Sequence, residues 1–231
     1  MVKSLMLSLV FTLLANHVFG FKQEDLDKLK RTNKCNKCDL TGLMLMTVAR
    51  NESEKYKDSP VVNINLTEAS LEFANLQRVQ ALQLNMAESK LMWADLRGSS
   101  LYSTNLTKAN LMGANLEKAN LIDSNLTETV LIGSKLTEAR LNRSDLRGAN
   151  LIDADLTKAK LIGANLSGAY LSTTILRFAD LTGANLIRAD LSLADLTGVV
   201  LREANVDQVV WGKVKLCNTT MSDGTVLHRD C

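Results

Sequence analysis

The chain has 231 residues, of which 27 are Lys or Arg and 25 are Asp or Glu. This balance excludes a strongly basic surface for nucleic acid and an acidic mimic of DNA, so we expect no nucleic-acid partner. Only 4% of the residues are aromatic and a single proline is present, an unusual composition for a compact enzyme domain.

Residues 1–20 have the pattern of a secretory signal peptide. Lys3 supplies the positive start, an apolar run extends from Leu5 to Ala15, and Gly20 is a small residue at the expected cleavage point. The alternative is a transmembrane anchor, but the run is too short to span a bilayer comfortably. We therefore expect an exported protein, in a periplasm, in a lumen or secreted, with no transmembrane anchor after cleavage.

Residues 21–34 are predicted to form an N-terminal capping helix. The segment 22–31 places Leu26 and Leu29 on one side, and its acidic residues precede its basic ones, which suits the helix dipole. We expect this helix to cover one end of the repeats that follow, because bare strand edges invite aggregation.

An apolar residue recurs at every fifth position from Leu66 to Leu216, and all but four of these positions are occupied by Leu. Two positions earlier the residue is almost always small, most often Ala, and one position earlier it is most often Asn or Asp. A regular helix would scatter these leucines around its axis, and a flat strand would alternate them between two faces. The backbone must therefore turn a corner in every unit, which predicts a solenoid. The exceptions to Leu are Ala81, Met86, Val206 and Trp211.

The flanks of the array depart from this regularity. The five-residue step already occurs at Cys35, Leu40 and Leu45, but in a different register. We expect a loop insertion at about residues 47–60, since Arg50 to Pro60 is polar and contains the only proline. Beyond Leu216, an Asp-Gly pair at 223–224 between short extended segments predicts a hairpin. Residues 217–231 would then form a C-terminal cap.

These residues resemble the pentapeptide-repeat proteins over about residues 35–231. The segments Cys35-Asn36-Lys37-Cys38-Asp39-Leu40-Thr41-Gly42 and Leu216-Cys217-Asn218-Thr219-Thr220-Met221-Ser222-Asp223-Gly224 resemble the two ends of exported members, except that Ser222 replaces the usual proline. The resemblance implies an all-β fold: a right-handed quadrilateral β-helix over residues 35–216, with four units per coil and each Leu at the centre of a side. At about 4.8 Å per layer, the stack would be about 38 Å long. Eight of the 12 glycines lie two residues after a Leu, where corners need open backbone angles.

Four cysteines allow three disulfide pairings. In the implied fold Cys35 and Cys38 lie at one end and Cys217 and Cys231 at the other, while bridged Cα atoms lie within about 7 Å of each other. We therefore expect the disulfides Cys35–Cys38 and Cys217–Cys231. The alternatives for the first pair are a redox pair or half of a zinc site. The two histidines lie in the signal peptide and at the far end, so we expect no metal and no cofactor.

The residues that follow each Leu differ between the four sides of such a coil, which we number 1 to 4 beginning with the side of Leu66. Sides 1 and 3 are polar, and side 4 carries Leu82, Tyr102, Ile122 and Ile162 interrupted by Asn142. Side 2 begins with Glu72, continues with Met92, Met112, Ile132 and Ile152, and ends with Ser172 and Ser192. The alternatives to a contact surface are the β-propensity of strand faces and cover by the 47–60 loop. The contact strip predicted on side 2 comprises Phe73, Met92, Trp93, Met112, Ile132 and Ile152.

The sequence contains no catalytic triad, phosphate-binding loop or dinucleotide fingerprint, so we expect no enzyme and no catalytic residue. The first hypothesis is an exported structural or protein-binding scaffold with a protein or envelope partner. The second is a DNA-mimicking protein that binds DNA gyrase or another topoisomerase, a role that some pentapeptide-repeat proteins have. The neutral charge and the signal peptide of this chain disfavour that role. A passive rod without a ligand is the third hypothesis.

Overall fold

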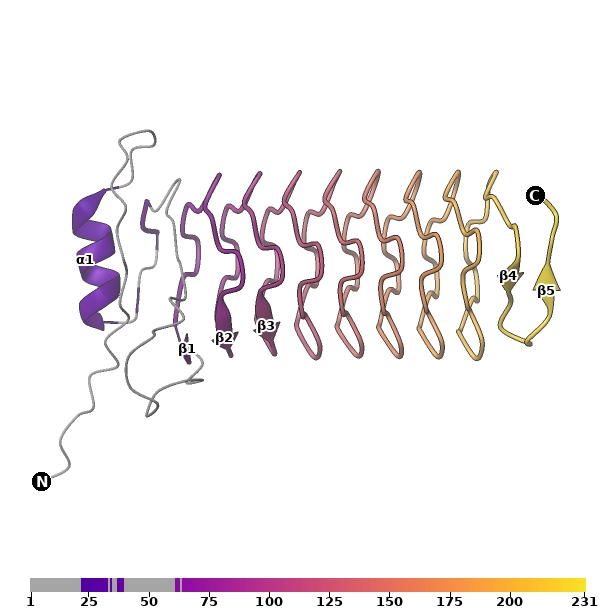
Figure 1. Ribbon diagram of the computed structural model, residues 1–231, viewed down its shortest axis with the longest axis horizontal. Coiled ribbons are helices and arrows are strands. Elements are labelled where there is room, and N and C mark those ends of the chain that lie inside the picture. Colours follow the sequence, from indigo (N-terminus) through magenta and orange to yellow (C-terminus); the bar gives the residue numbers. More distant parts are fainter. Residues whose placement is uncertain (1–21, 33, 35–36, 40–60, 63) are drawn as a thin grey trace, which may run out of the picture.

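The computed structural model describes residues 22–32, 34, 37–39, 61–62 and 64–231. Helix α1 (Gln23–Thr32) lies at one end of a stack of coils, and a hairpin of β4 (Thr219–Thr220) and β5 (Val226–Leu227) lies at the other (Figure 1). The predicted signal peptide and the predicted insertion at about 47–60 lie outside the described residues.

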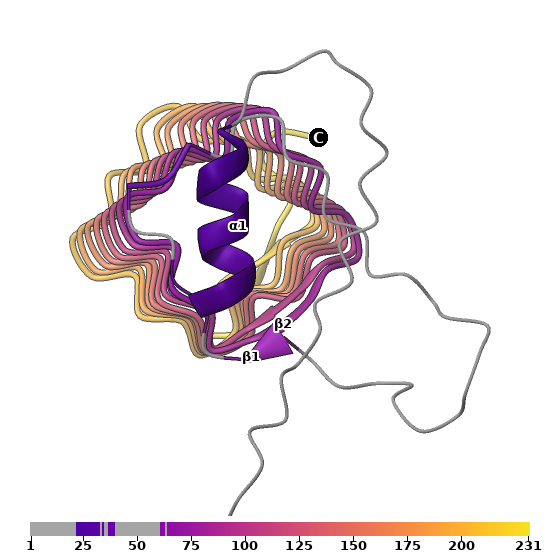
Figure 2. The ribbon, with the colours of Figure 1, turned by 90° about the vertical axis from the view of Figure 1, so that its left-hand side faces the viewer.

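Each coil consists of four five-residue units. The backbone bridges pair residues of neighbouring coils and are parallel throughout the array, as in Asn65 with Asn85 and Asn85 with Asn105. The step from Asn65 to Asn85 corresponds to four units, so the four-sided closure that the resemblance implied is present. Figure 2 shows the coils superposed along the stack, with α1 lying across the near end.

Extended structure is confined to very short pieces. β1 (Val61–Val62), β2 (Gln80–Leu82) and β3 (Ser100–Tyr102) form a parallel sheet on side 4. Along the rest of the repeat array the ladder consists of isolated bridges, one residue per unit. The reason is geometric: a backbone that turns in every unit has no room for longer strands.

The corner between two sides is a β-turn. The carbonyl of Leu106 accepts a hydrogen bond from the N–H of Ala109 at 2.9 Å, and Lys108 between them has a φ of 57°. Every residue two positions after a repeat apolar residue, from 68 to 208, has a φ between 52° and 70°. This positive φ at the third residue is typical of a type II turn. The predicted glycine corners therefore lie where expected, but most of these corner positions are not Gly.

The unit Asn105–Ala109 shows where the backbone N–H groups of a repeat donate. Those of Asn105, Leu106 and Lys108 bond to carbonyls of the adjacent coils at 2.9, 2.7 and 2.9 Å, and that of Ala109 closes the turn. The remaining one, of Thr107, donates to Oδ1 of Asn105 at 3.1 Å. Asn or Asp before the Leu thus completes the hydrogen bonding of the unit, since an unpaired buried N–H is costly.

Two inward columns fill the interior. The repeat leucines from Leu91 to Leu201 are at most 2% exposed, and the small residues two positions before them are also buried. Where Ser or Thr replaces Ala, most hydroxyls bond to a backbone carbonyl, as Ser124 Oγ does to Leu101 at 2.7 Å. Near the first coils, Ala81 replaces a Leu and the larger Leu84 occupies the neighbouring small position, so the core volume is conserved.

The N-terminal end is covered by α1. Leu26 and Leu29 are buried at 0% and 2% exposure, and Oδ2 of Asp25 accepts a hydrogen bond from the N–H of Asp39 at 2.8 Å. Asp39 forms a parallel backbone bridge with Ser70, and Ser70 forms one with Lys90. The first bridge joins residues that are further apart along the chain than those of the second. The chain between Asp39 and Ser70 therefore contains additional residues beyond one regular coil.

The C-terminal tail folds back on the last coil. Cys217 and Cys231 are joined by a disulfide with their Cα atoms 4.8 Å apart, and Asp230 exchanges two hydrogen bonds with Leu216. Cys38 is also in a disulfide, and its predicted partner Cys35 lies outside the described residues.

Several Asp residues in the array have a lowered pKa, which makes stability depend on pH. Hydrogen bonds from Arg147 hold the pKa of Asp145 below its ordinary value, despite an opposing effect of burial. A depressed pKa in the folded state means that the contribution to stability is present above the unfolded value of about 3.9 and is lost as pH falls through the folded value.

We therefore expect the free energy of unfolding, measured by urea titration, to fall as pH is lowered from about 5 to about 2. Asp145→Asn should flatten this fall, because the amide oxygen can still accept the bond from the Arg147 N–H but cannot titrate. If this substitution left the pH dependence unchanged, the lowered pKa of Asp145 would not contribute to the stability of the fold.

Candidate protein-binding surface

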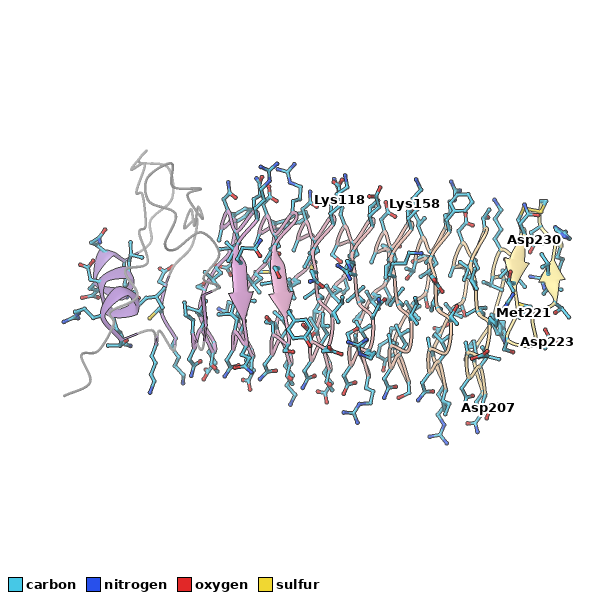
Figure 3. All side chains as sticks on the ribbon, turned by 60° about the horizontal axis from the view of Figure 1, so that its bottom comes forward. Lys118, Lys158, Asp207, Met221, Asp223 and Asp230 are labelled. Atoms are coloured by element: carbon cyan, nitrogen blue, oxygen red, sulfur yellow. A yellow bond between two sulfur atoms is a disulfide. The ribbon has the colours of Figure 1, made fainter. Side chains whose placement is uncertain are left out.

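The four sides of the coil differ in what they present to solvent. Sides 1 and 3 are opposite each other, and Figure 3 shows Lys118 and Lys158 of side 3 on one edge of the stack and Asp207 of side 1 on the other. Both sides carry ion pairs, such as Arg147 with Asp145 at 2.6 Å. Such exposed pairs contribute about 0–1 kcal/mol each and leave a hydrated surface.

Side 2 carries the predicted contact strip. The structure places the strip in successive coils, and two of its members, Phe73 and Trp93, are 54% and 58% exposed. The four aliphatic members are half-buried. The strip is therefore a continuous apolar surface whose most exposed parts are its two aromatic rings.

The apolar surface extends beyond that strip. Tyr170, Leu193 and Val210 also lie on side 2 or its corner and are 53%, 57% and 52% exposed. They were not predicted, because the prediction rested mainly on the residue directly after each Leu, whereas these lie one position before it or two after it. We call the full surface the apolar side: Phe73, Met92, Trp93, Met112, Val130, Ile132, Ile152, Tyr170, Leu193 and Val210.

The apolar side has at least one such residue in each of its coils, and no other side does. Side 1 has Ile187 as its only large apolar outward residue, and side 3 has Ile175 and Phe178. On side 4, Tyr102 and Ile162 are 38% and 40% exposed, but polar residues interrupt the series.

Side 4 is further broken by an ion pair. Arg143 binds Asp123 through two hydrogen bonds of 2.7 Å. These hydrogen bonds hold the pKa of Asp123 below its ordinary value, so the pair is charged at neutral pH. A charged pair beside Tyr102 and Ile162 makes side 4 a poorer apolar contact surface than side 2.

Trp93 lies flat on the next coil because residue 113 is glycine. A Cβ atom placed on Gly113 would come within 2.3 Å of the Trp93 ring, closer than any real contact. Gly133, one coil further on, has a similar φ of 61° and nothing within 4 Å of an added Cβ. Gly113 therefore leaves the space that the ring occupies on the apolar side, and Gly133 offers a matched control.

We expect Gly113→Ala to displace the Trp93 ring and Gly133→Ala to leave it in place. Both substitutions add the same methyl group at a positive φ, so their backbone costs of about 1 kcal/mol should be alike. The measurement is tryptophan fluorescence in a Trp211→Phe background, where Trp93 is the only tryptophan. Equal emission spectra for the two variants would contradict the predicted contact.

Within the described part of the chain, no group of three His, Cys, Asp or Glu side chains could hold a metal ion. Nδ1 of His228 lies 2.7 Å from Oδ1 of Asn218 in the C-terminal tail. No helix among the described residues is both long and apolar enough to cross a membrane. The apolar side is the candidate functional site because it carries an outward apolar residue in each of its coils.

Comparison with solved structures finds other pentapeptide repeat proteins. HetL, which is involved in heterocyst differentiation regulation in the cyanobacterium Nostoc sp. strain PCC 7120, is 27% identical, with 84% of this chain and 91% of that chain covered and a TM-score of 0.49. QnrB1, a plasmid-mediated fluoroquinolone resistance protein, is 18% identical, with 79% and 91% covered and a TM-score of 0.45. A protein from the Arabidopsis thaliana thylakoid lumen is 32% identical, with 47% and 66% covered and a TM-score of 0.23.

Among curated protein sequences, none matches the chain. The family profile of pentapeptide repeats matches eight copies, in residues 64–101, 89–127, 124–161 and 174–210. These segments cover more than half of the sequence and coincide with the four-sided coils described above. The chain therefore belongs to the pentapeptide repeat family, whose fold is a right-handed β-helix solenoid.

Proposed function

We propose that this chain is an exported, non-enzymatic solenoid that binds a protein partner through its apolar side. One observation carries the proposal: an apolar side chain lies on side 2 in every coil, and five of these side chains are more than half exposed. Contiguous exposed apolar surface is uncommon on soluble proteins and is typical of contact sites.

A passive rod would not need this surface. Sides 1 and 3 belong to the same coils and are polar in all but one coil each, so a coil does not need an apolar outward residue to fold. The β-propensity of strand faces should act on all four sides alike, and it therefore does not explain why one side differs. Selection for a contact on that side explains the difference.

Two features support export. The first is the signal peptide predicted over residues 1–20. The second is the disulfide Cys217–Cys231, since disulfides persist in oxidising compartments. Mass determination of the protein isolated from its native cell should give a chain that begins at Phe21, and a chain that still begins at Met1 would contradict export.

Site-specific photocrosslinking in the native compartment tests the binding role. A photoreactive amino acid at position 112 lies on the apolar side, and one at position 157 lies on polar side 3 at the equivalent repeat position. We expect a discrete protein adduct from position 112 and none from position 157. Identical adduct patterns from both positions, or no adduct from position 112, would overturn the proposal.

The DNA-mimicking alternative lacks support from charge. Basic and acidic residues are equal in number over residues 61–216, whereas a mimic of DNA needs a strongly acidic rod. We expect no inhibition of DNA gyrase supercoiling by sub-micromolar mature protein. Inhibition at that concentration would favour the alternative.

A further inference from the structure

The apolar side runs along the axis of the stack rather than around it. Its central residues Met92, Met112, Ile132 and Ile152 follow one another at the same position of successive coils. We propose that the ligand of this side is an amphipathic α-helix of the partner protein, lying along the stack with a basic flank. This inference rests on the proposed function and specifies the chemistry of the partner.

The spacing of the coils favours a helix over an extended peptide. Four successive coils span three layers, about 14 Å at about 4.8 Å per layer. Three steps along the apolar face of a helix, at about 3.5 residues per step and a rise of about 1.5 Å per residue, span about 16 Å. Three same-face steps of a strand span about 20 Å, which exceeds the roughly 14 Å of the four coils by more than the spacing of one layer. A helix of about three turns or more therefore keeps one apolar residue over each coil.

Glycine lowers the surface beside the central part of this strip. Gly113 and Gly133 occupy the corner next to Met112 and Ile132, where a side chain would otherwise project. The ring of Trp93 lies over Gly113 and extends the apolar side toward that corner. The apolar side therefore includes both its central column and this corner, and the apolar face of a helix likewise spans more than one row of side chains.

The charge beside the apolar side favours a basic flank on the helix. In the N-terminal part of the apolar side, the outward residues of side 2 and its two bordering corners from residue 68 to residue 153 include five acids and two lysines. The C-terminal part has no acidic excess, because Asp190 is accompanied by Arg188 and Lys213. Nζ of Lys37 forms an ion pair with Oε2 of Glu68 at 3.4 Å, and Nζ of Lys108 forms one with Oε2 of Glu128 at 3.7 Å. In the described parts of the chain, no ion pair involves the exposed Glu88. The acids are Glu68, Glu72, Glu88, Glu128 and Asp153, and the lysines are Lys90 and Lys108.

Three synthetic peptides, each long enough for roughly four turns of helix, test the inference with the disulfide-intact mature protein. The first is a capped helix former with Leu at helical spacing and Lys along one flank. The second has Glu in place of each Lys, and the third has the composition of the first with its Leu residues at alternate positions. The dissociation constant of each is measured by Trp93 fluorescence in the Trp211→Phe background and by calorimetry.

We expect the basic helical peptide to bind at least tenfold more tightly than the other two, and more weakly as salt is raised. Met112→Glu should weaken it at least tenfold, and Ile162→Glu, the same kind of change on side 4, should not. Glu88→Lys should reduce the preference for the basic flank. Equal binding of the helical and alternating peptides, no binding of either, or indifference to Met112→Glu would overturn the helix.

The outcomes separate this inference from the proposed function. A protein adduct at position 112 together with failure of the helical peptide would leave the binding role intact and reject the helix. If position 112 gave no adduct and the helical peptide did not bind, the binding role would be rejected as well. Sedimentation that shows a dimer of the mature protein, dissociated by Met112→Glu but not by Ile162→Glu, would assign the apolar side to a second copy of this chain and overturn the inference.

Discussion

Leu146→Asp is expected to abolish the cooperative melting of the protein. Leu146 is 0% exposed in the middle of the stack, between Leu126 and Leu166 of the adjacent coils. The substitution removes about 1.5–3 kcal/mol of apolar burial and places a carboxylate with no partner in the core, which costs several kcal/mol more. Each coil contacts only its neighbours, so a disrupted central coil also separates the two halves of the stack.

The measurement is a thermal melt followed by circular dichroism, with Ser167→Asp as the control. Ser167 lies one residue after a repeat Leu on the same side and points outward, so the same acid there should shift the midpoint little. A single sharp transition for Leu146→Asp at the midpoint of the parent would show that this leucine does not fill the interior.

Leu26→Ala is expected to destabilise the N-terminal end by about 2–5 kcal/mol, as is usual for a fully buried leucine. Weakening α1 would also uncover the backbone edge of the first coil, where unpaired N–H and C=O groups can recruit another chain. We therefore expect both a lower denaturation midpoint and concentration-dependent association, measured by urea titration and by size-exclusion chromatography.

Lys28→Ala provides the control for this end. Lys28 is exposed on the same helix, and its removal should change neither property measurably. If Leu26→Ala behaved like Lys28→Ala, the helix would not be protecting the first coil. Association without a change in stability would indicate that α1 shields the edge but contributes little to folding.

The period of five was enough to predict a solenoid, because neither a helix nor a flat strand keeps Leu91 to Leu201 on one continuous surface. It was not enough to predict four sides. That number depends on how sharply each unit turns, and it came from the family resemblance before the register of the backbone bridges showed it. The structure shows that the small residues two positions before each Leu also point inward, beside the leucine column.

Two roles within the unit were understood only with the structure. Asn105 was one of many Asn residues before a Leu, and the period does not reveal that its side chain accepts the one N–H left over by the coil ladder. The glycines indicated where the corners lie, but residues such as Lys108 and Glu128 occupy the same positive φ. Most corners of this array therefore place a residue other than Gly at a positive φ.

The extent of the apolar side was also underestimated. Tyr170 precedes a repeat Leu and Leu193 follows one by two positions, so neither belongs to the column on which the prediction mainly rested. Only the position of the corners shows that these columns border the same surface. A search for apolar residues that recur once per coil, over all outward positions, would have found them.

Disulfide trapping between adjacent coils tests the central claim most directly. Thr137 and Thr157 lie at the same repeat position of side 3 in successive coils, at a spacing that a disulfide can bridge. Thr137 and Ile152 are closer along the chain, three repeat units apart, but lie on different sides. We expect Thr137→Cys with Thr157→Cys to form an intramolecular disulfide on mild oxidation, and Thr137→Cys with Ile152→Cys to form none. A bridge between positions 137 and 152 and none between 137 and 157, mapped by mass spectrometry, would contradict the four-sided coil.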